Sequence, residues 1–272
     1  MTIVRVRAPA STANLGPGFD CAAVALDLWN ELDVTEGDGA LDLDHLGVRA
    51  FARLASVEGR QFTFVDRIPR ERGLGSSAAI IALGLVAAAA AEGLDLAGEE
   101  LLAEGLPLEG HADNLAAALA GGVCLTWDAK IARLADDAPA VPIALVPETT
   151  VSTAAARAAL PSEVAHEHAV FTAGRATLLG AALASGSAEL FAEALTDLLH
   201  EPYRADGAPL LAAVRERPPA HALGSSLSGS GPAVIVWTRR ESAPACVEEL
   251  EARFPDVSVL ALSVSPRGAH VL

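Results

Sequence analysis

The amino-acid sequence predicts an α+β protein with two lobes. Strand and helix patterns are mixed through the first half of the chain, prolines then cluster at Pro139, Pro142 and Pro147, and the chain ends in a β-α-β order. Because the prolines mark a transition, we expect an N-terminal lobe at residues 1–147 and a C-terminal lobe at residues 148–272.

The first lobe is expected to contain both strands and helices. Alternating apolar and polar residues predict strands, and apolar residues spaced three or four apart predict helices. The expected strands cover residues 3–7, 31–35, 61–65, 123–127 and 143–146. The expected helices cover residues 46–57, 77–92, 98–104 and 112–120.

The second lobe is expected to begin with helices and to end with strands. Helical patterns start at Thr153 and continue at residues 163–184, 188–199 and 209–216. Strand patterns at residues 222–227, 233–238 and 257–264 then alternate with a helix at residues 243–253. This ending is typical of a small split β-α-β sandwich.

Composition and charge narrow the classes of partner. Charged residues make up 20% of the chain and hydrophobic residues 51%, which predicts a folded globular protein. The net charge of −16 argues against nucleic acid or an anionic membrane as a partner. Cys21, Cys124 and Cys246 form no paired motif, so we expect neither a zinc site nor a disulfide, and a cytoplasmic location.

Two segments that resemble targeting or membrane signals are better explained otherwise. Residues 1–7 alternate apolar and polar side chains, which favours a strand over a signal peptide. Residues 73–91 carry no charge, but glycine, serine and alanine dominate them, which favours a buried helix over a membrane span.

The most informative segment is Gly73-Leu74-Gly75-Ser76-Ser77-Ala78-Ala79, which leads into this uncharged helix. Unpaired N–H groups and the dipole at a helix N-terminus favour an anion, so the segment predicts a phosphate cradle. A serine hydroxyl there can also reach a metal ion. Taken alone, such a loop is more often a turn followed by a helix cap.

The commoner phosphate motifs do not fit this segment. A Walker-type loop needs a lysine after its last glycine, and the only lysine, Lys130, lies far from any glycine-rich loop. The dinucleotide pattern also fails, because Ala78 stands where its third glycine belongs. Neutralisation of a bound phosphate must therefore come from backbone, arginine and metal.

Two further segments of small residues, 9–20 and 227–232, complete a pattern of three. With all three in order, nearly the whole chain resembles the kinase family named for galactokinase, homoserine kinase, mevalonate kinase and phosphomevalonate kinase. Residues 9–20 resemble the homoserine kinase form P-A-S-x-A-N-L-G-P-G-F-D, and the stretches at residues 109–114, 153–161 and 201–204 agree with it.

The resemblance implies a two-lobed small-molecule kinase, with a ribosomal-protein-S5-domain-2-like first lobe and a ferredoxin-like second lobe. It implies transfer of phosphate from ATP to L-homoserine in threonine biosynthesis. By the same resemblance, Gly73 to Ala78 bind the ATP phosphates, Ser77 and Glu109 hold Mg²⁺, and Asn114 contacts the transferred phosphate. A homodimer is a possible assembly of such relatives.

A zwitterionic acceptor needs a carboxylate for its ammonium group and a guanidinium for its carboxylate. Asp20 fits the first role, Arg157 and Arg204 fit the second, and Asn14 and His111 complete the polar shell, as the resemblance implies. Without the resemblance, Asp20 would more often cap a turn, Arg157 would face solvent and His111 would cap a helix.

The residues alone do not identify a catalytic base. Asp113 could accept the hydroxyl proton, but the resemblance favours direct transfer to the γ-phosphate, with Asn114 and Mg²⁺ stabilising charge. A kinase with a mevalonate-type acceptor and a catalytically silent binder are alternatives. A serine hydrolase is another, because residues 75–79 lie one residue from the G-x-S-x-G pattern, with Ser77 as nucleophile.

Overall fold

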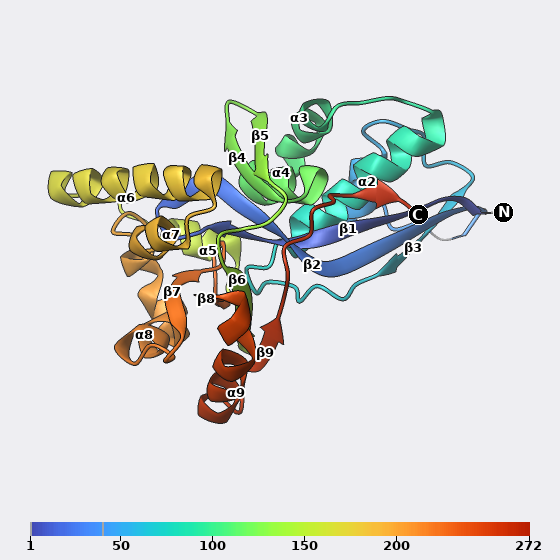
Figure 1. Ribbon diagram of the computed structural model, residues 1–272. Coiled ribbons are helices and arrows are strands. Elements are labelled where there is room, and N and C mark those ends of the chain that lie inside the picture. The colour runs from blue at the N-terminus through green and yellow to red at the C-terminus, as the bar shows by residue number, and fades with distance from the viewer. Residues whose placement is uncertain (1, 40) are drawn as a thin grey trace.

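The computed structural model describes residues 2–39 and 41–272, and its two antiparallel sheets form the two expected lobes (Figure 1). The first sheet has the order β10-β1-β2-β4-β5, and β3 also pairs with β2. Its strands are β1 (Thr2–Asn14), β2 (Gly18–Glu36), β3 (Arg60–Val65), β4 (Val123–Trp127), β5 (Lys130–Ala135) and β10 (His270–Val271).

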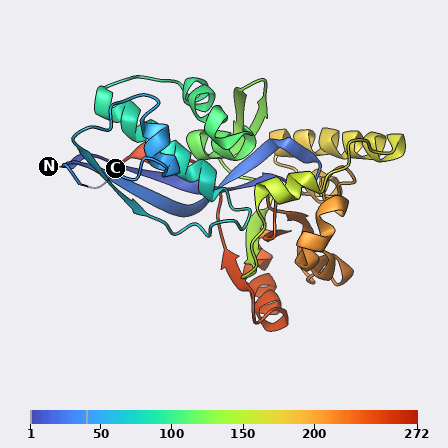
Figure 2. The ribbon, with the colours of Figure 1, turned by 180° about the vertical axis from the view of Figure 1, so that it is seen from behind.

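Helices of the first lobe gather on one face of this sheet (Figure 1). They are α1 (Leu46–Phe51), α2 (Ser76–Glu92), α3 (Gly98–Glu109) and α4 (Asp113–Ala120). Helix α2 is apolar on every side and almost wholly buried, as the uncharged stretch predicts for a core helix. The helix-rich second lobe is visible from behind in Figure 2, where α5 and β6 lie at the junction of the lobes.

The second sheet has the order β7-β8-β6-β9. Its strands are β6 (Val141–Val146), β7 (Ala222–Leu227), β8 (Val234–Thr238) and β9 (Ser258–Ala261). Helices α5 (Thr153–Ala158), α6 (His166–Ser185), α7 (Ala188–Ala194) and α8 (Pro209–Glu216), with the 3-10 helix η1 (Pro202–Gly207), connect β6 to β7. The turn η2 (Arg240–Ser242) and α9 (Ala243–Arg253) connect β8 to β9, which completes a ferredoxin-like split β-α-β arrangement.

The chain crosses between the sheets twice. Strand β6 precedes residue 147 and pairs with β8 and β9 of the second sheet, and β10 returns to pair with β1 of the first. The lobe boundary at residue 147 stays a prediction. One hydrophobic cluster continues through both lobes, since Leu26 and Leu83 belong to the same core as Phe191 and Trp237.

Several elements differ in extent from the sequence-based expectation. Strands β1 and β2 are far longer than expected because their central residues are buried on both faces, which removes the alternating pattern. Helix α3 continues through Pro107 to Glu109, whereas α1 stops at Phe51. Strands β5 and β10 were not expected, and neither was η1.

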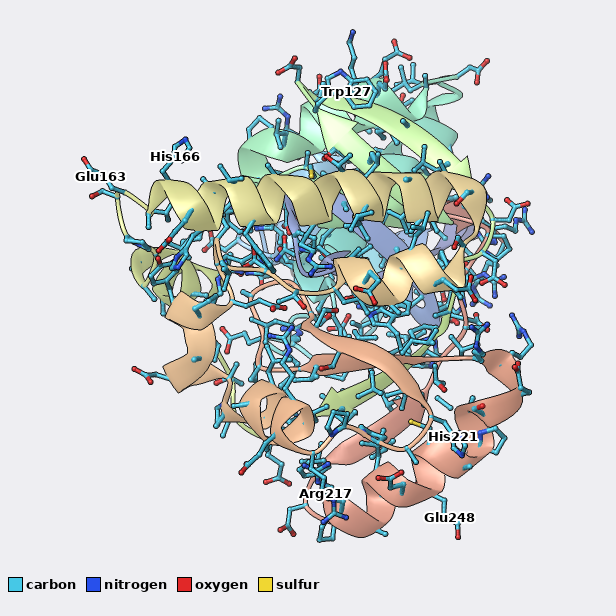
Figure 3. All side chains as sticks on the ribbon, turned by 60° about the vertical axis from the view of Figure 1, so that its left-hand side comes forward. Trp127, Glu163, His166, Arg217, His221 and Glu248 are labelled. Atoms are coloured by element: carbon cyan, nitrogen blue, oxygen red, sulfur yellow. The ribbon has the colours of Figure 1, made fainter. Side chains whose placement is uncertain are left out.

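The outer end of α6 lies on the surface. Glu163 and His166 are exposed there, and Figure 3 shows both pointing away from the molecule. Within residues 2–39 and 41–272, no helix combines the length and the apolar character that crossing a membrane requires.

Candidate active site

A pocket of about 270 Å³ is lined by residues of both lobes. The three small-residue segments all contribute to it, although they lie far apart in the sequence. Every sequence-predicted site residue lines the pocket except Ala78, which is fully buried in the first turn of α2. The predicted lining residues are Asn14, Asp20, Gly73, Leu74, Gly75, Ser76, Ser77, Glu109, His111, Asn114, Arg157 and Arg204.

The glycine-serine segment forms the N-terminus of α2. Gly75 is the N-cap residue with φ 67°, and no described side chain caps the helix. The first backbone hydrogen bond of the helix runs from the Ala79 N–H to the Gly75 carbonyl at 2.9 Å. The N–H groups of Ser76, Ser77 and Ala78 precede it in the chain. Free N–H groups and the positive end of the helix dipole together favour a bound phosphate.

Both glycines of this segment are required by their surroundings. A Cβ atom on Gly73 would lie 2.1 Å from the Ser228 carbonyl oxygen, and one on Gly75 would lie 2.0 Å from Ser11 Oγ. Their φ angles of +80° and +67° also favour glycine. At these two positions the backbone lies too close to its neighbours for a Cβ atom.

The first and third segments hold this loop in place. The Ser11 N–H donates to the Leu74 carbonyl at 3.1 Å, and Ser228 Oγ donates to the Gly73 carbonyl at 2.7 Å. The Gly229 N–H donates to the Ala13 carbonyl at 3.1 Å, which joins the first and third segments to each other. The three segments thus form one hydrogen-bonded unit.

Ser77 and Glu109 meet at the end of the pocket formed by the glycine-serine segment. Ser77 Oγ donates to Glu109 Oε2 at 2.6 Å, and burial raises the pKa of the Glu109 carboxyl. Mg²⁺ commonly takes one or two protein oxygen ligands and completes its shell with water and substrate phosphates. A hydroxyl beside a carboxylate fits that pattern, although the described residues contain no cluster of three or more typical metal ligands.

Asn114 lies in the first turn of α4, beside the glycine loop. Its Oδ1 accepts a hydrogen bond from Ser11 Oγ at 2.8 Å, and its Nδ2 donates to Asp113 Oδ1 at 3.5 Å with one hydrogen, which leaves the second hydrogen of Nδ2 for a ligand. The neighbouring Asp113 accepts the Asn114 backbone N–H at 2.7 Å and lies 3.4 Å from His111 Nδ1. The Asp113 carboxylate raises the pKa of His111, which burial opposes.

Asp20 and Arg157 form a two-pronged ion pair. Arg157 Nη1 and Nη2 donate to the two Asp20 oxygens at 3.0 and 2.7 Å. Asn14 holds the backbone of Asp20, since its Oδ1 accepts the Asp20 N–H at 3.1 Å. Its Nδ2 donates to the Gly229 carbonyl at 2.9 Å. Two residues predicted to bind opposite charges of one ligand therefore contact each other in the structure.

Arg204 is fixed deeper in the pocket wall, with only 5% of its surface exposed. Its Nη1 donates to the Gly229 carbonyl at 3.1 Å and its Nε to the Ala156 carbonyl at 3.4 Å. Phe19 lies against the guanidinium groups of both Arg204 and Arg157, at 5.1 and 5.8 Å from its ring centre. Burial lowers the pKa of Arg204.

Sequence reasoning missed residues that support the site. Ser11 belongs to the first segment, but its contacts with Gly75 and Asn114 depend on the fold. His200, which hydrogen-bonds Arg204, directly precedes the stretch at residues 201–204, and that position was the available signal. Val151 and Ser230 also line the pocket.

The fold and the cradle together define a class, the small-molecule kinases with a helix-terminal phosphate site. Residues 45–122 match the GHMP kinases N terminal domain, and residues 180–256 match the GHMP kinases C terminal domain. A serine hydrolase does not fit, because residues 66–75 include no strand leading into the Ser77 turn.

Relatives that match nearly the whole chain identify the group within the GHMP kinases. A homoserine kinase of Gloeobacter violaceus is 38% identical, covering 98% of this chain and 98% of its own, and one of Streptomyces coelicolor is 37% identical, covering 99% and 94%. The crystal structure of homoserine kinase from Cytophaga hutchinsonii has a TM-score of 0.86 at 26% identity, covering 99% of this chain and 97% of its own. The chain belongs to the homoserine kinases of the GHMP kinase family.

A more distant structure shares the fold alone. The crystal structure of a mevalonate kinase has a TM-score of 0.73 at 15% identity, and it covers 96% of this chain and 99% of its own.

Proposed function

We propose that this chain transfers the γ-phosphoryl group of ATP to the hydroxyl group of L-homoserine, a step of threonine biosynthesis. The observation that carries the proposal is one pocket that joins a helix-terminal cradle to Asp20, Arg157 and Arg204. A cradle suits the phosphates of ATP, and a carboxylate beside two guanidinium groups suits a small zwitterion. The relatives named homoserine kinase support the same acceptor.

The phosphate end supplies positioning and charge stabilisation. We assign the ATP phosphates to the N–H groups at the start of α2, and the transferred phosphoryl group to Asn114 Nδ2. Ser77 and Glu109 would hold Mg²⁺, which when bound neutralises charge on the phosphate oxygens. The fixed amide and backbone donors then need no rearrangement as negative charge shifts toward the leaving group.

The acceptor end orients the hydroxyl for direct in-line attack. Asp20 receives the ammonium group, Arg157 and Arg204 receive the carboxylate, and His111 and Asn14 border the chain between them. We assign the hydroxyl proton to an oxygen of the transferred phosphoryl group rather than to Asp113, whose Oδ1 accepts the Asn114 N–H and lies 3.4 Å from His111 Nδ1. Alignment therefore contributes more to the rate than a dedicated base.

The setting of the reaction follows from composition. We place it in the cytoplasm, where the three cysteines would stay reduced, as they are in the structure. The net charge of −16 supports a small-molecule substrate over nucleic acid or an anionic membrane. A homodimer is compatible with this proposal and is not required by it.

An assay of ADP release with rival acceptors tests the proposal. The purified chain is given Mg²⁺ and ATP with L-homoserine, mevalonate or galactose. We expect turnover with homoserine to exceed the others by at least about a hundredfold, because mevalonate lacks the ammonium group and galactose lacks both charges. Turnover with mevalonate or galactose instead of homoserine, or with none of the three, would contradict the proposal.

A further inference from the structure

His200 lies behind the acceptor end of the pocket, in the turn between α7 and η1. Its side chain is fully buried. The turn is shaped by Asp197, whose carboxylate accepts the backbone N–H groups of Leu199, His200 and Glu201 at 2.9, 2.7 and 2.9 Å. These bonds fix the backbone of the turn on both sides of the imidazole.

The hydrogen bonds of His200 define its tautomer. Arg204 Nη1 lies 3.2 Å from His200 Nδ1, and a guanidinium group can only donate, so Nδ1 is the acceptor. The ring hydrogen is therefore on Nε2, which donates to the Gly16 carbonyl at 2.8 Å. The imidazole is neutral in this arrangement, because a protonated ring would turn a donor toward the Arg204 cation.

Through these two bonds His200 connects the halves of the acceptor site. Gly16 lies in the turn between Asn14 and Asp20, on the side assigned to the ammonium group. Arg204 belongs to the side assigned to the carboxylate. The His200 ring also stacks on Phe19 at a centroid distance of 4.8 Å and an interplanar angle of 20°, directly beside Asp20.

The contacts of Arg204 leave one part of its guanidinium for a ligand. Nε and Nη1 bond to the Ala156 and Gly229 carbonyls and to His200. Within the described part of the chain, Arg204 Nη2 forms no hydrogen bond. Arg204 lines the pocket, so this group is the one left for a ligand. The three acceptors thus fix the plane of the guanidinium and the direction of its remaining donor.

We propose that His200 is a positioning residue, which holds the Arg204 guanidinium at a fixed distance from the turn that carries Asn14 and Asp20. It thereby matches the spacing of the carboxylate-binding and ammonium-binding groups to a short amino acid. This inference rests on the proposed function, because it takes L-homoserine as the ligand that both groups contact.

The charges around His200 agree with a neutral ring. Burial lowers the pKa of His200 to about 4, and the nearby Arg204 acts in the same direction. Asp197, whose Oδ2 lies 3.6 Å from Nε2, the hydrogen bond to the Gly16 carbonyl and the more distant Asp20 oppose this shift of the pKa. At neutral pH the Nδ1 acceptor is therefore available to Arg204.

Two substitutions separate the two bonds of the ring. In His200→Asn the amide falls near the Nδ1 position and can still accept from Arg204, whereas in His200→Gln it falls near the Nε2 position and keeps only the bond to Gly16. We expect His200→Gln to raise the homoserine KM about tenfold or more, with kcat and the ATP KM within about twofold. His200→Asn, which keeps the bond to Arg204 but loses the bond to Gly16, should also raise the homoserine KM, by about threefold to tenfold, with kcat and the ATP KM within about twofold.

Thr172→Val is the matched control for the stability of the turn. Thr172 Oγ1 accepts the Leu198 N–H at 3.2 Å, so it anchors the same segment to α6 without contacting Arg204. We expect this variant to lower Tm and to leave the homoserine KM unchanged. If the wild type phosphorylates homoserine, two results would overturn the inference and leave the proposed function standing. One is an equal rise in the homoserine KM for Thr172→Val, and the other is no rise for His200→Gln.

A second readout does not depend on turnover. The ¹⁵N spectrum of the His200 ring in the free wild-type protein should show hydrogen on Nε2 at pH 7, and hydrogen on Nδ1 would overturn the inference. A wild-type chain that does not phosphorylate homoserine overturns the proposed function, and the inference fails with it because there is then no acceptor to position.

Discussion

Asp20 and Arg157 show how the site accommodates its own charges without a ligand. The two side chains are each more than a third exposed, and such an ion pair contributes only about 0–1 kcal/mol to stability. Under the proposed function, a zwitterion that inserts between them would replace one ion pair by two. Opening the pair would then oppose binding only weakly, and the exchange would favour ligands that carry both charges.

The buried imidazole of His200 predicts how stability responds to acid. Its pKa is about 4 in the folded chain against an ordinary value of 6.5, so the unfolded chain takes up this proton first as the pH falls. The contribution to the free energy of unfolding is complete above about pH 6.5 and is lost as the pH falls toward 4. It amounts to at most about 3 kcal/mol.

Urea unfolding of the wild type and His200→Asn at pH 7 and pH 5 measures this contribution. Glu109 and Glu201 have raised pKa values and shift stability in the opposite direction, so the difference between the two chains is the relevant quantity. We expect the wild type to lose more stability than the variant between these pH values. Equal losses would show that His200 is not held neutral by the fold.

The types of residue in the pocket were predictable, but their supporting contacts were not. The motifs located Asn14, Asp20, Arg157 and Arg204 because each contributes a group that a phosphate or zwitterion needs. Ser11 and His200 act through other residues, and their partners Asn114 and Gly16 lie 103 and 184 positions away. Such pairings are determined by the packing of the lobes and leave no local pattern.

Helix α2 has glycines in the left-handed conformation at both ends, which provides a matched test of the cradle. Gly75 and Gly93 have φ angles of +67° and +66°, so alanine at either position adds about 1–2 kcal/mol of backbone strain. A Cβ on Gly75 would collide with Ser11, whereas one on Gly93 meets nothing within 4 Å. Gly75→Ala must therefore move Ser11 or shift the glycine-serine segment, whereas Gly93→Ala adds backbone strain alone.

We therefore expect Gly75→Ala to lower kcat/KM for ATP about a hundredfold, because small displacements of positioning groups cost that much. Gly93→Ala should lose stability alone and keep its activity. Steady-state kinetics and thermal unfolding of both variants make the comparison. Similar activity in the two variants would show that the cradle tolerates the collision with Ser11.

The sequence pattern located β3 closely but underestimated the length of β2. Strand β3 alternates between half-buried and exposed residues, and it was found at the expected position. The middle of β2 is buried throughout, so it has no period to detect. Helix α7 ends five residues earlier than expected, and the turn that follows it is held by Asp197, which accepts the backbone N–H groups of Leu199 and His200.

The two lobes do not divide the core between them. Phe191 and Trp237 of the second lobe belong to the same cluster as the centre of α2. A separate cluster that includes Leu145 and Cys246 lies between the second sheet and its helices. The continuous core predicts that the chain unfolds as one cooperative unit rather than lobe by lobe.

The net charge of −16 predicts a dependence of stability on salt. Raising KCl from about 20 to about 300 mM shortens the Debye length from about 20 to about 6 Å, which weakens repulsion among the excess carboxylates. We expect Tm to rise by a few degrees, since the exposed ion pairs that salt also weakens contribute little. A fall in Tm would mean that those pairs outweigh the repulsion.

The third small-residue segment has a consequence for the order of synthesis. Ser228 and Gly229 bind the backbone of Gly73 and Ala13, which a ribosome translates more than 150 residues earlier. The nascent chain can therefore contain the entire glycine-serine loop and still lack the walls that shape it. Nucleotide binding should appear only after residues 228–229 have left the exit tunnel, so an incomplete chain in the cell would not sequester ATP.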